Sequence, residues 1–146
     1  MVNSRTKGAD FERKTCQILN LEFGQVFNFR RDLEQYREGL HGDICCDDPD
    51  WPFVIELKRY ANGPQGGQPA WWQQAKDAAN AAEKLPILIY KYDRRDPVVV
   101  LQLSTIADAI GSHSESTDLY QTSLPAWITL AREVMAHQEL EERQKW

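Results

Sequence analysis

Three residues in the first half of the chain have types and spacings that suit metal-dependent hydrolysis. Asp43 begins a short apolar run, and Glu56 and Lys58 stand on either side of Leu57 at the end of a longer one. Side chains alternate between the two faces of a strand, so Glu56 and Lys58 would share a face while Leu57 points to the core. A neighbouring strand can bring Asp43 to that face. Two carboxylates there suit Mg²⁺ or Mn²⁺, and a lysine beside them can orient water or stabilise charge on a phosphate.

The Glu56 and Lys58 pair also has a simpler interpretation. An acidic and a basic residue two positions apart on a strand most often form a surface salt bridge without any catalytic role. The surrounding sequence favours chemistry, because the triplet ends a strongly apolar strand and follows the run Gly42-Asp43-Ile44 by a gap that suits a hairpin. A helical segment that contains residues 7–13 precedes both.

Periodicity and turn residues predict the elements that would position these residues. Apolar residues recur with helical spacing over residues 11–21, where Ser4 or Asp10 is available as the N-cap. Three runs are expected to be strands, and the last two form a hairpin around an acidic turn. These strands are residues 25–30, 42–46 and 53–58, with the turn at residues 47–50.

The second half of the chain continues the alternation of helices and strands. Residues 62–69 have the glycine and proline content of a flexible loop. The expected helices are residues 70–84, 104–110 with Ser104 as cap, and 124–144. The expected strands are residues 86–92 and 98–103, which pair as a second hairpin with its turn at residues 93–97. Residues 111–123 are expected to be a loop. This order predicts an α/β protein with a mixed central β-sheet flanked by helices. We expect one domain over residues 1–146, with a motif-bearing core at 7–103 and a C-terminal helical extension at 104–146.

Composition limits the class of protein. A length of 146 residues suits one domain with its own core. The three cysteines, Cys16, Cys45 and Cys46, form no CxxC pair, and an odd count argues against a secreted disulfide framework. The apolar runs are too short to cross a bilayer, so we expect no membrane association and a cytoplasmic location. The net charge of -5 weighs against a polyanionic partner, although basic residues gather locally.

Three segments together resemble a known enzyme family. Residues 7–13, the Gly42-Asp43-Ile44 run and the Glu56-Leu57-Lys58 triplet resemble the PD-(D/E)XK nucleases, most closely the archaeal and phage Holliday-junction resolvases. The resemblance implies a restriction-endonuclease-like fold, Mg²⁺ as cofactor with Mn²⁺ as a substitute, and branched or four-way-junction DNA as substrate. Symmetric cutting of a junction needs two active sites, so we expect a homodimer. The phage-like resemblance suggests a viral protein that acts in the cytoplasm of a bacterial host.

The resemblance also assigns roles to individual residues. It implies that Glu12 is the first-helix glutamate, that Asp43 and Glu56 bind the metal, and that Lys58 is the catalytic lysine. In such sites the backbone carbonyl at the position of Leu57 often completes the metal shell. The following helix often carries a glutamine, for which Gln74 is the candidate and Gln73 is one residue away.

Basic and aromatic residues near these positions are candidates for DNA contacts. They are Lys7, Arg30, Arg31, Arg37, Arg59 and Trp72. Each arginine has the alternative of being an ordinary solvated surface residue. Trp71 and Trp72 follow the glycine-rich loop, and core packing is an alternative for at least one of them.

Three other functions are compatible with parts of the sequence. A restriction-type or repair-type nuclease of the same superfamily would use the same residues on ordinary duplex DNA. A non-catalytic DNA-binding module would have no need of two carboxylates facing a polyanion without a metal. A protein-binding scaffold that uses the tryptophans and the acidic last helix would bind neither divalent metal nor DNA.

Overall fold

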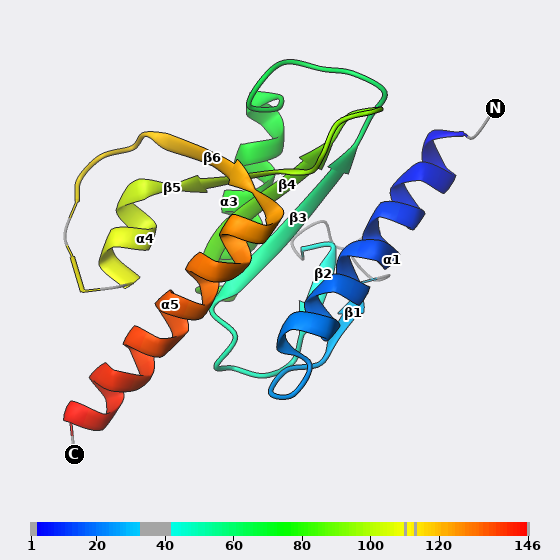
Figure 1. Cartoon of the computed structure of the whole chain (residues 1–146). Coiled ribbons are helices and arrows are strands. Elements are labelled where there is room, and N and C mark those ends of the chain that lie inside the picture. Colours follow the sequence, from blue (N-terminus) through cyan, green and yellow to red (C-terminus); the bar gives the residue numbers. More distant parts are fainter. Residues whose placement is uncertain (1–2, 33–41, 110, 113, 146) are drawn as a thin grey trace.

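Ten helices and strands make up the described part of the chain. The computed structural model describes residues 3–32, 42–109, 111–112 and 114–145 (Figure 1). In chain order the elements are α1 (Ser4–Phe23), β1 (Phe29–Arg31), β2 (Ile44–Cys46), β3 (Phe53–Arg59), α3 (Pro69–Ala82), β4 (Leu85–Lys91), β5 (Val98–Gln102), α4 (Leu103–Ala109), β6 (Leu119–Ser123) and α5 (Leu124–Gln144).

The strands form one mixed sheet in which spatial order follows chain order, from β1 to β6. The central strands β3 and β4 are parallel, and every other neighbouring pair is antiparallel. Parallel neighbours need a crossover connection, which α3 provides. The antiparallel pairing of β2 with β3 and of β4 with β5 confirms the two expected hairpins.

Helices cover both faces of this sheet. Ile55 and Leu57 of β3 belong to the main core with buried residues of α1 and α5, such as Leu19 and Trp127. The alternate residues face α3, so that Val54 of β3 packs with Ala78 and Ala79 of that helix. Figure 1 shows α1 and α5 on the near side of the sheet and α3 behind it. The expected mixed sheet flanked by helices is confirmed.

The first helix begins earlier and the first strand is shorter than expected. Asn3 caps α1, and its side chain accepts a hydrogen bond of 2.8 Å from the backbone N–H of Thr6. Neither Ser4 nor Asp10 is the cap, because both lie inside the helix. The strand β1 begins only at Phe29, whose backbone N–H and C=O are both bound by the side chain of Asn20 at 2.9 and 3.0 Å. Asn20 thus satisfies backbone groups at the sheet edge.

A strand lies where we expected a loop. β6 occupies residues 119–123 and pairs with β5 along its whole length. Its five residues are mostly exposed, so they lack the alternation of buried and exposed positions that identifies a strand in a sequence. Leu103–Ala109 forms a helix as expected, but Ser104 lies within it rather than capping it.

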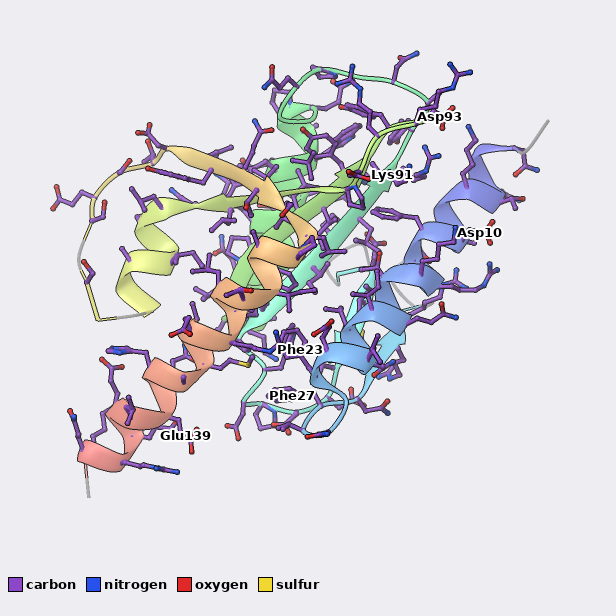
Figure 2. All side chains as sticks on the ribbon, viewed as in Figure 1. Asp10, Phe23, Phe27, Lys91, Asp93 and Glu139 are labelled. Carbon is purple, nitrogen blue, oxygen red and sulfur yellow. The ribbon has the colours of Figure 1, made fainter. Side chains whose placement is uncertain are left out.

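The last helix is part of the main core. Trp127, Ala131 and Val134 of α5 are fully buried, together with Phe11 and Phe23 of α1. Figure 2 shows Phe23 and Phe27 in the region between the end of α1 and α5. Residues after 103 therefore supply a strand and a core helix, where we expected a helical extension. None of the helices in the described ranges is long and apolar enough to span a membrane.

Candidate active site

The strand β3 presents Glu56 and Lys58 on the face of the sheet that α3 covers. Glu56 is 1% exposed, and Lys58 is half-buried near the end of the strand. The Nζ atom of Lys58 lies 3.6 Å from Oε1 of Glu56. The predicted shared face is thus observed, but the pair is not a surface salt bridge, because the carboxylate is removed from solvent.

Asp43 enters the same site from the start of β2. Its backbone N–H donates to the carbonyl of Ile55 at 2.8 Å, and its Oδ2 accepts from the backbone N–H of Leu57 at 2.6 Å. The neighbouring Gly42 makes this approach possible. A Cβ atom at Gly42 would lie 2.6 Å from the carbonyl oxygen of Ile55, which is closer than real Cβ atoms come.

Two buried carboxylates at one place perturb each other. Burial raises the pKa of Glu56 to about 8, the nearby charge of Asp43 adds to this rise, and Lys58 opposes it. The Oε2 atom of Glu56 is buried and has no hydrogen-bond partner. An unpartnered buried acceptor is costly, so a ligand that satisfies it would stabilise the site.

The helix α3 contributes a residue that holds the lysine. Nζ of Lys58 donates to Oε1 of Gln74 at 2.8 Å. The adjacent Gln73 instead donates to Asp77 one turn along the same helix, at 2.8 Å. Of the two glutamines considered from the sequence, Gln74 is therefore the one that contacts Lys58.

Glu12 lies on a different face of the sheet from Glu56 and Lys58. It belongs to α1, and its Oε2 accepts a hydrogen bond of 2.8 Å from Nε of Arg31 and forms an ion pair of 2.8 Å with Nη2 of the same arginine. Arg31 pairs with Ile44 in the β1 and β2 ladder, next to Asp43. Glu12 thus contacts the strand that adjoins the carboxylate pair, through Arg31.

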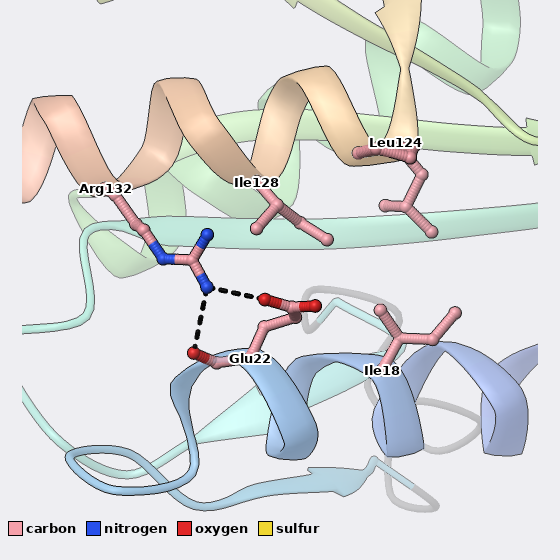
Figure 3. Close-up of a pocket in the computed structure, with 6 residues that line it drawn as sticks. Ile18, Glu22, Leu124, Ile128 and Arg132 are labelled. Atoms are coloured by element: carbon pink, nitrogen blue, oxygen red, sulfur yellow. Dashed lines mark hydrogen bonds and ion pairs between the residues drawn. The ribbon is translucent and has the colours of Figure 1, made fainter.

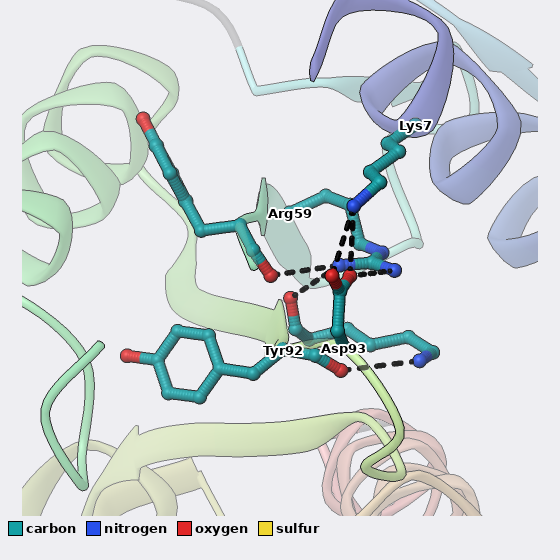
Figure 4. A network of polar contacts seen from close by, with 6 residues as sticks. Lys7, Arg59, Tyr92 and Asp93 are labelled. Carbon is teal, nitrogen blue, oxygen red and sulfur yellow. Dashed lines mark hydrogen bonds and ion pairs between the residues drawn. The ribbon is translucent and has the colours of Figure 1, made fainter. Parts of the chain in front are cut away.

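Two of the proposed DNA-binding residues converge on a carboxylate that the sequence did not single out. Lys7 contacts both carboxylate oxygens of Asp93 at 3.0 and 2.9 Å, and Arg59 reaches Oδ1 of Asp93 at 2.7 Å (Figure 4). These bonds link α1, the end of β3 and the turn after β4. Such a network across three elements can only be found once the fold is known.

The other proposed DNA contacts lie in varied surroundings. Arg30 is exposed and pairs with Asp47 at 3.0 Å. Trp72 of α3 is buried in the cluster between this helix and the sheet, with 9% of its surface exposed. Arg37 lies outside the described residues.

A hollow in the surface lies away from the carboxylate pair. It has a volume of about 230 Å³ and lies between α1 and α5, where it is lined mainly by Ile18, Leu124 and Ile128 (Figure 3). An ion pair between Glu22 and Arg132 borders it. Its lining is apolar and contains none of the predicted catalytic residues.

Comparison with known proteins identifies the family. Residues 3–132 match the family described as "Phage putative PDDEXK endonuclease". The chain belongs to this family. PDDEXK membership places the chain among nucleases. A search among curated proteins gave no match. Among solved structures, Hjc of Archaeoglobus fulgidus, a Holliday junction resolvase from an archaeal hyperthermophile, is similar, with 13% identity and a TM-score of 0.49 over 86% of this chain and 98% of that chain.

PDDEXK nucleases generally use divalent metal ions, so we examined whether the carboxylate pair fits one. The part of the chain that the structure describes has no group of three or more His, Cys, Asp or Glu side chains that could hold a metal. Asp43 and Glu56 nevertheless offer hard oxygen donors, one of which is buried without a partner. Mg²⁺ is usually held by one or two carboxylates and keeps several waters. The pair therefore fits an ion of this kind.

Proposed function

We propose that this PDDEXK nuclease is a metal-dependent, structure-selective DNA endonuclease, and specifically a Holliday-junction resolvase. The observation that supports a catalytic site most strongly is the buried pair of Asp43 and Glu56, with an unpartnered carboxylate oxygen and a lysine held beside it. Two buried carboxylates can both be charged only at a high cost, which a cation bound between them would offset.

In this proposal Asp43 and Glu56 bind Mg²⁺, for which Mn²⁺ substitutes. The ion would polarise the phosphate and lower the pKa of a bound water. Lys58 then orients the attacking water or stabilises the negative charge that develops on the phosphate. Gln74 fixes the position of the lysine ammonium through its 2.8 Å hydrogen bond. Glu12 supports the site from a greater distance by holding Arg31 next to Asp43.

The backbone carbonyl of Leu57 is proposed as a further metal ligand. The N–H of Leu57 points toward β2, because it donates to Oδ2 of Asp43. The N–H and C=O of one strand residue point to the same side, so the carbonyl of Leu57 also faces the Asp43 side of β3. A carbonyl oxygen that points this way could be the third oxygen ligand of an ion held by Asp43 and Glu56.

DNA binding is proposed for Lys7, Arg30, Arg31, Arg37, Arg59 and Trp72. Lys7 and Arg59 both pair with the carboxylate of Asp93, and this group of three residues has a net positive charge that suits a phosphate. Arg31 would contact DNA while it keeps its ion pair with Glu12. Because Trp72 is buried, little of its ring is available for stacking on a base.

Junction resolution is supported by the likeness of residues 7–13, 42–44 and 56–58 to the Holliday-junction resolvases. Two symmetric cuts require two active sites, so the proposal includes a homodimer. Light scattering should then give about twice the chain mass of 16.9 kDa. The proposed place of action is the cytoplasm of a bacterial host.

A direct comparison of substrates tests the choice of DNA. An immobile four-way junction and linear duplexes of its arm sequences are incubated with the protein in Mg²⁺, Mn²⁺ or EDTA. We expect paired, symmetric nicks on the junction, which depend on the metal, and little cutting of the linear duplexes. Equal cutting of both substrates would overturn the junction preference and leave a nuclease of the restriction or repair type.

A further inference from the structure

An exposed tyrosine lies against a buried tryptophan beside the proposed active site. The rings of Tyr60 and Trp71 are stacked, with centroids 5.0 Å apart and planes inclined by 14°. Trp71 is buried, whereas 47% of Tyr60 is exposed. One face of the tyrosine ring is therefore covered by Trp71 while a large part of the side chain stays open to solvent.

The tyrosine follows Lys58 on the same face of the sheet. The N–H of Tyr60 donates to the carbonyl of Lys91 at 3.1 Å, which continues the pairing of β3 with β4 by one residue. Residues two apart on a strand point to the same face at a spacing of about 7 Å. Tyr60 thus stands next to Lys58 on the side that α3 covers.

Two contacts between β3 and α3 run side by side. Lys58 binds Gln74, and Tyr60 stacks on Trp71. Trp71 and Gln74 are three residues apart on α3, which places them on neighbouring parts of one helix face. The ammonium group of Lys58 and the ring of Tyr60 are therefore neighbours on one surface.

The tryptophan beneath this ring is firmly packed. Rings of Tyr90 and Tyr92 lie 6.2 and 6.3 Å from that of Trp71. On the loop side, a Cβ atom at Gly67 would come within 2.9 Å of the indole. A platform that is ordered before binding loses little conformational entropy when a ligand is added.

The loop that precedes α3 is tied to the same cluster. The hydroxyl of Tyr92 donates to the carbonyl of Pro64 at 2.7 Å, and the N–H of Gly66 donates to the hydroxyl of Tyr90 at 2.9 Å. These bonds hold a segment that its glycine and proline content predicted to be flexible. The same loop carries exposed polar residues, Asn62 and Gln65.

We propose that the open face of Tyr60 stacks on the exposed face of a nucleobase at the branch point, next to the cleaved phosphate. The inference rests on the proposed nuclease function and gives a physical basis for selecting branched DNA. A base within a duplex already stacks on both faces, whereas a base at a branch point has a face free for an aromatic ring.

The test measures binding without cleavage. Wild type, Tyr60→Ala, Tyr60→Phe and the control Tyr120→Ala are titrated in EDTA against a labelled fork whose branch-point base is unpaired. Tyr120 is a suitable control because it is similarly exposed, at 52%, but lies on the edge strand β6. A fully paired duplex and a fork with an abasic site at the branch point are measured in parallel. Melting temperatures verify that each variant is folded.

We expect Tyr60→Ala to bind the fork about 5- to 150-fold more weakly than wild type, the range for loss of one base stacked on an aromatic ring. Tyr60→Phe and Tyr120→Ala should bind as wild type does. On the abasic fork, wild type and Tyr60→Ala should bind equally, because the stacking partner is gone.

Two results would overturn the inference. One is equal binding of the unpaired fork by wild type and Tyr60→Ala; the other is the same loss on the fork, the abasic fork and the duplex. In either case metal-dependent cleavage by the wild type would show that the proposed nuclease function stands without it. Absence of cleavage and of all DNA binding by the wild type would remove both.

Discussion

At the scale of single residues, the pKa of Glu56 links the site to the pH of the solution. Glu56 is 1% exposed and lies close to Asp43, and burial raises its pKa to about 8. The carboxyl group therefore keeps its proton at a pH where an ordinary glutamate is charged.

The raised pKa of Glu56 predicts that the stability of the metal-free protein depends on pH. The folded state keeps this proton up to about pH 8, whereas the unfolded chain loses it near 4.5, so the folded state binds more protons between these values. The free energy of unfolding should therefore fall as pH rises through this window. The slope is at most about 1.4 kcal/mol per pH unit, the limit for one proton.

Urea unfolding in EDTA across this pH range measures the effect. Glu56→Gln, which cannot ionise, should show a shallower slope than wild type, and the exposed control Glu142→Gln should follow wild type. The same slope in wild type and Glu56→Gln would show that Glu56 ionises in the folded protein much as it does in the unfolded chain.

Gln74 is predicted to act as a positioning residue for Lys58. Gln74→Ala removes a hydrogen bond to a charged group, so kcat should fall at least about tenfold. KM for DNA should change little, since Gln74 is not proposed to bind the substrate. Gln74→Glu keeps an oxygen acceptor and should retain more activity than the alanine variant.

The neighbouring glutamine supplies the control for this experiment. The side chain of Gln73 donates to Asp77 and not to the site, so Gln73→Ala should leave kcat near the wild-type value. Equal losses of kcat in Gln73→Ala and Gln74→Ala would contradict the assignment.

The contacts of these residues were only partly predictable from the sequence. Strand alternation was enough to place Glu56 and Lys58 on one face. The choice of Gln74 over Gln73 depends on the phase of α3, and the bond from Arg31 to Glu12 depends on how α1 packs on the sheet. Both require the tertiary structure.

At the scale of elements, the site depends on the contact between the start of β2 and β3. The strands with apolar runs and the two hairpins were predictable, because their patterns are local. The strand β6 was not, since its exposed residues carry no alternation and its partner β5 defines it. The N-cap of α1 was missed because three capping residue types lie near the helix start, at Asn3, Ser4 and Asp10.

Gly42→Ala tests the contact between these strands. The added methyl group would overlap the carbonyl of Ile55, so we expect a loss of stability of about 1–3 kcal/mol and weaker metal binding through displacement of Asp43. The control is Gly8→Ala in α1, where no atom lies within 4 Å of the added Cβ. That variant should gain about 0.5–1 kcal/mol, as expected for alanine in a helix.

Denaturant unfolding and calorimetric titration with Mn²⁺ measure both quantities. If Gly42→Ala were as stable as wild type and bound the metal equally well, the close packing of β2 on β3 would not be what places Asp43.

At the scale of the whole molecule, the last helix completes the core that supports the sheet. The sequence predicted α5 but not its role, because burial of Trp127 depends on contacts with Trp51 and Phe53 from distant parts of the chain. Net charge was also a poor guide. The total of -5 includes the acidic end of α5, whereas Lys7 and Arg59 gather at the end of β3.

Trp127→Ala should therefore destabilise the entire domain. The side chain is completely buried, and its removal is expected to cost about 3–5 kcal/mol. Leu140→Ala, on an exposed part of the same helix, should change the free energy of unfolding by no more than about 0.5 kcal/mol. Similar small effects of both substitutions in urea unfolding would mean that α5 is not part of the cooperative core.

The most direct test of the central claim is a metal titration of DNA cleavage by wild type, Asp43→Asn and Asp50→Asn. Asp50 is an exposed aspartate in the turn between β2 and β3 and serves as the matched control. We predict that the wild type and Asp50→Asn cut a labelled four-way junction only when Mg²⁺ or Mn²⁺ is added. The cleavage rate of Asp43→Asn should fall by more than about 100-fold, the upper end of the loss typical of residues that only support a metal ligand. Cleavage by Asp43→Asn at the wild-type rate, or undiminished cleavage in EDTA, would contradict the claim that Asp43 and Glu56 form a metal-dependent nuclease site.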